Sequence, residues 1–94
     1  NGAVAEERRA AERYDADGEI LLFVEGLSRP VVASLLDVSA SGFRARHTYS
    51  SLESGQKVVF QHSSGSGEAV AVWKRLMGKD VEGGFVIKTA PYVW

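Results

Sequence analysis

The sequence predicts a small all-β domain, folded as a six-stranded antiparallel barrel or as a sandwich. Short apolar runs rich in β-branched residues recur along the 94-residue chain, and Gly- and Ser-rich segments separate them. Strands that follow one another at such close spacing are typical of small antiparallel barrels and sandwiches. A chain of this length also holds one domain rather than two.

The first 18 residues differ in composition from the rest of the chain. Residues 3–13 are rich in Ala, Glu and Arg, but their apolar residues form no wide stripe at helical spacing. The cluster YDADG (14–18) then indicates a turn. We therefore expect residues 1–18 to form a flexible N-terminal arm and residues 19–94 to form the β-domain.

Three strands are expected in the first half of the β-domain. The apolar run EILLFVEG (19–26) is bounded by glycines, which mark the ends of a strand. The run VVASLLDVS (31–39) is rich in β-branched residues, which favour strands. The segment FRARHTY (43–49) alternates Phe, Ala and His with Arg, Arg and Thr, as a half-exposed strand does. We expect the first two of these strands to pair.

Three further strands are expected in the second half of the chain. They are QKVVFQH (56–62), EAVAVWKRLM (68–77) and FVIKT (85–89). The Gly- and Ser-rich segment SSGSG (63–67) predicts a flexible hairpin connection, and GKDVEGG (78–84) predicts another turn. The aromatic residues of the tail APYVW are expected to cover one end of the barrel.

The balance of charges narrows the range of partners. The chain has 11 basic and 12 acidic residues and a net charge of −1, whereas non-specific nucleic-acid binders carry a basic excess. Because the chain has no cysteine, disulfides and cysteine-ligated metals are excluded. A helix needs about 20 consecutive apolar residues to span a bilayer, and no apolar run in the chain is nearly that long. We therefore expect a soluble, cytoplasmic domain that has no metal or cofactor, does not bind DNA or RNA and does not span a membrane.

Two clusters of polar residues are candidates for a binding site. Arg9 and Arg13 lie four residues apart, so they share one face whether the arm is helical or extended. Asp37 and Ser39 lie two residues apart near the end of an expected strand, so they face the same side of the sheet. Gly42 follows at a point where a tight turn with positive φ, or the close approach of a flat ligand, would require glycine.

The order and spacing of these clusters resemble those of a known family. Arg9-x-x-x-Arg13 followed by Asp37-x-Ser39-x-x-Gly42 is similar to the signature RxxxR and [D/N]xSxxG of the PilZ domain family. The segments SLESGQKVVFQ, EAVAVWKR and GGFVI look like the later strands of that family. The resemblance implies a six-stranded antiparallel β-barrel that is a receptor for the bacterial second messenger cyclic di-GMP.

The resemblance also implies a role for each matched residue. Arg9 and Arg13 would contact the phosphates and the guanine edges of the ligand. Asp37, Ser39 and Gly42 would shape the surface beneath a guanine. A guanidinium group matches both a pair of phosphate oxygens and the O6 and N7 atoms of guanine. The Asp37 carboxylate can accept hydrogen bonds from guanine N1 and N2, which adenine does not offer.

Three further residues are candidate ligand contacts, namely Arg8, Ser41 and Trp73. Arg8 precedes the first motif and looks like the basic residue of family members that hold two self-stacked ligands. We therefore expect a stacked pair of cyclic di-GMP molecules, because four phosphates need more positive charge than two. Trp73 lies where the family often has an aromatic residue near the ligand, although a tryptophan in a strand commonly packs within the protein. Ser41 lies inside the second motif.

Two classes of function follow from this pattern. In the first, cyclic di-GMP orders the arm against the barrel and changes a surface that is presented to an attached domain or an effector protein. In the alternative, the domain is a PilZ-like protein-interaction module that does not bind nucleotide. Such modules typically lack the signature, so its completeness favours the receptor. We expect no enzymatic activity, because no histidine lies beside Asp37 and Ser39 to act as a base.

Overall fold

The structure, a computed structural model, describes residues 14–89 and 91–94. These residues form seven strands and no helix. The strands are β1 (Tyr14–Asp15), β2 (Glu19–Val24), β3 (Val31–Ser39), β4 (Gly42–His47), β5 (Lys57–His62), β6 (Gly65–Met77) and β7 (Asp80–Ile87). The expectations for Arg8, Arg9 and Arg13 concern residues that lie outside the described ones.

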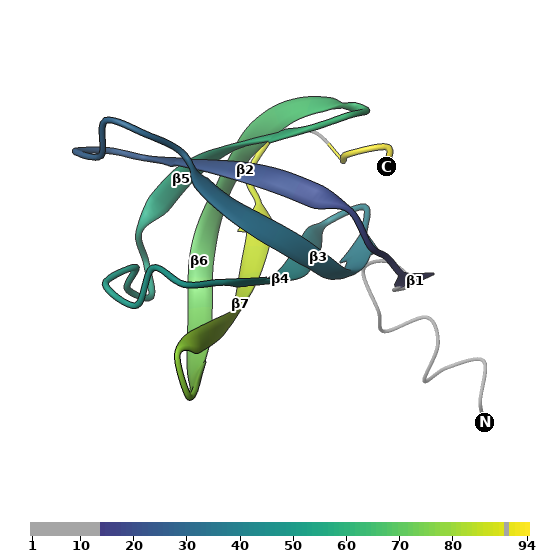
Figure 1. Cartoon of the computed structure of the whole chain (residues 1–94). Helices are drawn as coiled ribbons and strands as arrows, with labels where there is room; N and C mark the ends of the chain where they lie inside the picture. Colours follow the sequence, from purple (N-terminus) through teal and green to yellow (C-terminus); the bar gives the residue numbers. More distant parts are fainter. Residues whose placement is uncertain (1–13, 90) are drawn as a thin grey trace.

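Six of the strands close into an antiparallel barrel (Figure 1). Neighbouring strands pair in the order β3, β2, β5, β6, β7 and β4, and β4 pairs with β3 to complete the ring. Closure leaves these six strands without an unpaired sheet edge. The expected six-stranded antiparallel barrel is thus confirmed. The short β1 lies outside the ring and pairs with the end of β3, with Tyr14 opposite Val38 and Asp15 opposite Asp37.

Two turns are shorter than the sequence predicts. β6 begins at Gly65 and pairs with β5 from that residue onward, so the connection expected over 63–67 is limited to Ser63 and Ser64. β7 begins at Asp80, so most of the turn expected over 78–84 belongs to a strand. Both predictions placed the start of the following strand too late, because they took every glycine as a sign of a turn.

Gly84 shows why the second turn was misplaced. Glycine indicates a turn because it tolerates positive φ, but neither Gly83 nor Gly84 has a positive φ. A Cβ at Gly84 would collide with the indole ring of Trp73 on the neighbouring β6. Gly84 is therefore a strand residue over which a side chain lies. The left-handed glycine of this turn is Gly78, at φ 67°.

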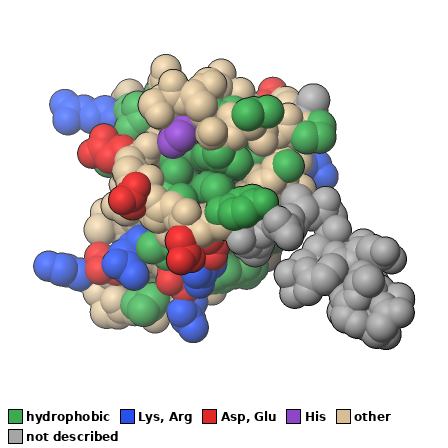
Figure 2. Space-filling model, turned by 90° about the vertical axis from the view of Figure 1, so that its right-hand side faces the viewer, with side chains coloured by type: hydrophobic (Ala, Val, Ile, Leu, Met, Phe, Trp, Pro, Cys, Tyr) green, Lys and Arg blue, Asp and Glu red, His purple; other side chains and the backbone are tan. Residues whose placement is uncertain are grey.

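Aromatic rings fill the middle of the barrel. Phe43 and Phe60 are fully buried, and the ring centroids of Phe43 and Phe85 lie 4.8 Å apart in a stacked arrangement. Each of the six barrel strands adds buried apolar side chains to this core. Figure 2 shows apolar side chains gathered near the centre of one face, with charged side chains toward its margins. Trp94 of the tail stacks on Phe60, so the expected aromatic cover over the barrel is present.

His47 is buried at the end of β4, and the fold favours the neutral form of its imidazole. Its Nδ1 accepts a hydrogen bond from the Tyr49 amide over 3.0 Å. Burial, together with the charge of Lys74, lowers the pKa of His47 from its ordinary value of 6.5. The unfolded chain therefore takes up this proton at a higher pH than the folded protein does. The contribution of neutral His47 to stability should be complete above pH 6.5 and should be lost as the pH falls through the lowered pKa.

Urea unfolding of the wild type and of His47→Asn, at about pH 7.5 and about pH 5.5, measures this contribution. Asparagine keeps an acceptor near the position of Nδ1 but does not titrate. The variant should therefore lose less stability on acidification than the wild type does. The same substitution at His62, which is less buried, is the matched control. Equal losses for the wild type and His47→Asn would contradict the assignment.

Candidate functional site

Asp37 and Ser39 lie on the outer face of the barrel at the end of β3. Ala33 and Leu35 point into the core, and strict alternation from them would turn Asp37 inward as well. A bulge between Leu35 and Asp37 inserts one additional residue into β3 and shifts the register. As a result Val38 points into the core, and its two neighbours Asp37 and Ser39 share the opposite face.

A second bulge, in β6, places Trp73 on the outside of the barrel. Ala69 and Ala71 are buried in the core, and the register shifts between Ala71 and Trp73. The side chain of Trp73 therefore lies on the outer face, 41% exposed, opposite Gly84 of β7. Because its indole lies over Gly84, Trp73 packs against the protein and still presents part of its ring to solvent.

Arg44 of β4 joins these two positions into one row. It is opposite Asp37 on one side and opposite Gly84 on the other. A row of outward residues thus crosses four strands in the order Asp37, Arg44, Gly84 and Trp73. Both Nε and Nη2 of Arg44 lie 2.9 Å from Oδ2 of Asp37. Charge-assisted contacts of this kind fix the orientation of the carboxylate.

The charges continue from Arg44 toward β6 and β7. Nη1 of Arg44 lies 3.6 Å from Oε1 of Glu82, and the same oxygen is 2.6 Å from Nη2 of Arg75. The side chain of Glu82 is only 6% exposed, so its two guanidinium partners offset the cost of burying a carboxylate. Arg44 was missed as a candidate in the sequence. It lies two residues after Gly42 in the same strand, and residues two apart in a strand face the same side of the sheet. This spacing was the signal in the sequence that Arg44 lies on the same face as Gly42.

Ser39 holds the turn from β3 to β4. Its hydroxyl donates to the Gly42 carbonyl over 3.3 Å and accepts from the Ser41 amide over 3.3 Å. Ser39 is buried, whereas Ser41 is exposed. Ser39 therefore shapes the turn, and Ser41 presents an exposed hydroxyl on it.

Position 42 has to be a glycine because β7 lies very close to it. Its φ is not positive, so the first of the two explanations that the sequence offered, a tight turn with positive φ, is wrong. A Cβ at this position would collide with the carbonyl oxygen of Phe85 on β7. The absence of a side chain thus allows β4 and β7 to approach each other beside the turn.

A shallow hollow of about 290 Å³ lies beside the row of outward residues. It is lined by Phe43, Arg44, Val72, Trp73, Gly84, Phe85 and Val86. Arg44 supplies a positive charge, and the ring of Trp73 supplies a flat apolar wall. A guanidinium and an aromatic face are both groups that interact with nucleotides.

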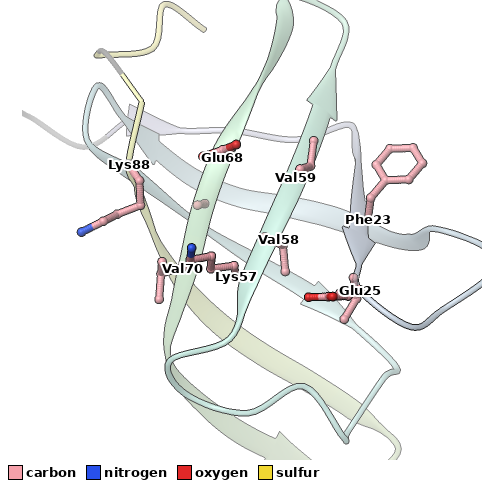
Figure 3. A pocket seen from close by; sticks show the side chains of 10 residues that line it. Phe23, Glu25, Lys57, Val58, Val59, Glu68, Val70 and Lys88 are labelled. Atoms are coloured by element: carbon pink, nitrogen blue, oxygen red, sulfur yellow. The ribbon is translucent and has the colours of Figure 1, made fainter.

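A second, larger hollow lies elsewhere, over β2, β5 and β6 (Figure 3). Its volume is about 480 Å³, and its walls are mainly apolar. The charged groups that line it are Glu25, Lys57, Glu68 and Lys88, two of each sign. It therefore offers no excess of positive charge to a phosphodiester, and it contains none of the residues that the sequence predicts for a binding site.

The described residues contain neither a metal-binding cluster nor a membrane-spanning helix. Residues 14–89 and 91–94 contain no group of three His, Cys, Asp or Glu side chains that could hold a metal ion. The same residues include no helix that is both long and apolar enough to cross a bilayer.

Comparison with known proteins identifies the fold. No family model matches the chain, and no curated protein matches it by sequence. Among solved structures, the chain is similar to the Bacillus subtilis inhibitor of motility, MotI/DgrA, with a TM-score of 0.71 over 88% of this chain and 16% sequence identity. The matched part spans 44% of that protein. Because MotI/DgrA is a PilZ-domain protein, the chain has a PilZ-like fold.

Proposed function

We propose that this domain is a receptor for cyclic di-GMP. The observation that carries the proposal is that the residue directly after the RxxxR motif pairs with the strand that bears the DxSxxG motif. Tyr14 directly follows Arg13 in the sequence, and it pairs with Val38, the residue between Asp37 and Ser39. β1 thus begins directly after the RxxxR motif and runs beside the part of β3 that bears Asp37 and Ser39. The PilZ-like fold supports the same function.

The chemistry of the outer face suits a guanine nucleotide. In the proposed complex, Asp37 accepts hydrogen bonds from guanine N1 and N2, and Arg44 keeps its carboxylate in place. Arg9 and Arg13 bind the phosphates and the O6 and N7 atoms of guanine. Arg8 supplies the additional positive charge that a stacked pair of ligands needs.

The remaining candidates shape the surface on which the ligand lies. The exposed Ser41 hydroxyl is available as a donor or an acceptor. Gly42 keeps β4 close to β7 and so fixes the position of the turn beneath the ligand. The exposed part of the Trp73 ring offers a stacking surface at the other end of the row.

Signal transmission would follow from the connection between the arm and β3. When a ligand bridges the arginines and the outer face of β3, it brings the arm against the barrel. The surface formed in this way differs from that of the empty domain, and an attached domain or an effector protein can distinguish the two.

Isothermal titration with cyclic di-GMP tests the proposal, with cyclic di-AMP as the control for base selectivity. Two or three charge-assisted interactions of about 1.5–3 kcal/mol each amount to about 3–9 kcal/mol, and the upper end of this range corresponds to about micromolar affinity. We expect selective binding of cyclic di-GMP, with two molecules per domain. Absence of binding at about 100 μM ligand, in a sample whose circular dichroism shows a folded β-protein, would contradict the receptor function.

A protein-interaction module that does not bind nucleotide is the second candidate. Apolar side chains on the outer face of β2, β3 and β5 favour it, since Phe23, Val32 and Val59 are 41%, 56% and 46% exposed. Clusters of exposed apolar residues commonly mark protein contacts. Failure of the folded domain to bind cyclic di-GMP would make this function the better explanation of the fold.

A further inference from the structure

The C-terminal tail binds the turn that carries the DxSxxG motif. The backbone amide of Tyr92 donates to the carbonyl of Ala40 over 3.0 Å. The indole Nε1–H of Trp94 donates to the carbonyl of Ser39 over 2.6 Å. Two consecutive peptide groups of the turn are therefore held by a segment that lies more than fifty residues later in the sequence.

The same tail is anchored to the end of the barrel. The ring of Trp94 stacks on Phe60, with centroids 5.9 Å apart and planes at 19°, and it meets Phe43 edge-on at 5.6 Å. The hydroxyl groups of Tyr92 and Ser64 lie 2.9 Å apart, which joins the tail to the β5–β6 turn. The turn of the candidate site is thus tied through Trp94 to fully buried rings of the core.

We infer that Trp94 is a positioning residue for the cyclic di-GMP site, and that the tail carries the effect of the ligand to the C-terminal side of the domain. This inference rests on the proposed function. The Ser39 carbonyl belongs to the peptide group that leads into the turn, so the indole fixes the plane of that group. Ser39 in turn holds Ser41 and Gly42 through its hydroxyl.

Coupling between the turn and the tail has to act in both directions. A residue that stabilises the binding geometry of the turn raises the affinity for the ligand. A ligand that stabilises the same geometry strengthens the hydrogen bond of the Trp94 indole by an equal free energy. Ligand binding at the site therefore changes how firmly the tail is held, and a partner that contacts the C-terminal end of the domain can respond to this change.

Trp94→Phe is the variant that tests the inference. Phenylalanine keeps an aromatic ring beside Phe60 and removes the donor to the Ser39 carbonyl. We expect the affinity for cyclic di-GMP to fall about fivefold, because the free turn is no longer held in its binding geometry. Amide hydrogen exchange of Ser41 and Gly42 should become faster in the absence of ligand, because the turn is held less firmly.

Tyr92→Phe is the matched control. It removes the contact with the Ser64 hydroxyl from the same tail but leaves the Tyr92 amide bonded to the Ala40 carbonyl. Its affinity for cyclic di-GMP should remain close to that of the wild type. In the wild type, the nuclear magnetic resonance signal of the Trp94 indole N–H should shift when ligand is added, and its hydrogen exchange should slow down.

The possible outcomes separate this inference from the proposed function. If the wild type does not bind cyclic di-GMP, the proposed function fails at the first titration, and the inference fails with it. If the wild type binds but Trp94→Phe has the same affinity as Tyr92→Phe, only the inference is overturned. Faster exchange at the turn with unchanged affinity, or an indole signal that the ligand does not alter, would also overturn it.

Discussion

Alanine at both Arg9 and Arg13 should weaken the affinity for cyclic di-GMP by at least about 100-fold, because each guanidinium is expected to supply about 1.5–3 kcal/mol of charge-assisted hydrogen bonding. The two losses together amount to about 3–6 kcal/mol, and about 1.4 kcal/mol corresponds to a tenfold change in affinity. The described strands begin only at Tyr14, so the barrel should remain folded. Isothermal titration measures the affinity, and circular dichroism verifies the fold.

Two double variants separate specific contacts from bulk charge. Arg29→Ala/Lys79→Ala removes two positive charges from exposed turns, so it changes the net charge from −1 to −3, as Arg9→Ala/Arg13→Ala does. Its affinity should remain within about twofold of the wild type, since exposed charges away from the site contribute little. Arg9→Lys/Arg13→Lys keeps the charge but lacks the planar fork, and its affinity should be intermediate. Equal losses for both alanine pairs would show that overall charge governs binding.

Gly42→Ala should lower the free energy of unfolding by about 1–3 kcal/mol even without ligand, because the added methyl group would overlap the Phe85 carbonyl oxygen. A backbone oxygen within a paired strand cannot rotate away as a side chain can. β4 and β7 would therefore have to separate where Gly42 pairs with Val86. Urea unfolding measures the loss of stability. Titration of the folded variant should also show weaker binding, because the turn of the candidate site moves with β4.

Ser41→Ala is the control for the glycine variant. It adds no atom and lies at the neighbouring, exposed position of the same turn. Its stability should remain within about 0.5 kcal/mol of the wild type, as is usual for surface substitutions. If Gly42→Ala were as stable as the wild type and lost only affinity, the glycine would serve the ligand alone, and the structural explanation given for it would be wrong.

The strands were predictable because each depends on local sequence. The run from Val31 to Ser39 was predicted with the same bounds as β3, since β-branched residues and flanking turn residues mark both ends. The end of β6 at Met77 was also predicted, but the start of β7 was not. Glycine has two uses in this chain, a left-handed turn at Gly78 and space for an indole at Gly84. Sequence alone does not distinguish them, because the indole comes from another strand.

The sequence by itself determined the all-β fold and the spacing of the two motifs. A period of two was enough to put Asp37 and Ser39 on one face. Only the tertiary structure decided that this face is the outer one and that Trp73 lies on it too, because two bulges reverse the alternation of β3 and β6. Bulges depend on how many residues the partner strands supply. The contact of Trp94 with the turn at Ser39 likewise exists only once the barrel has closed, since it joins residues far apart in the chain.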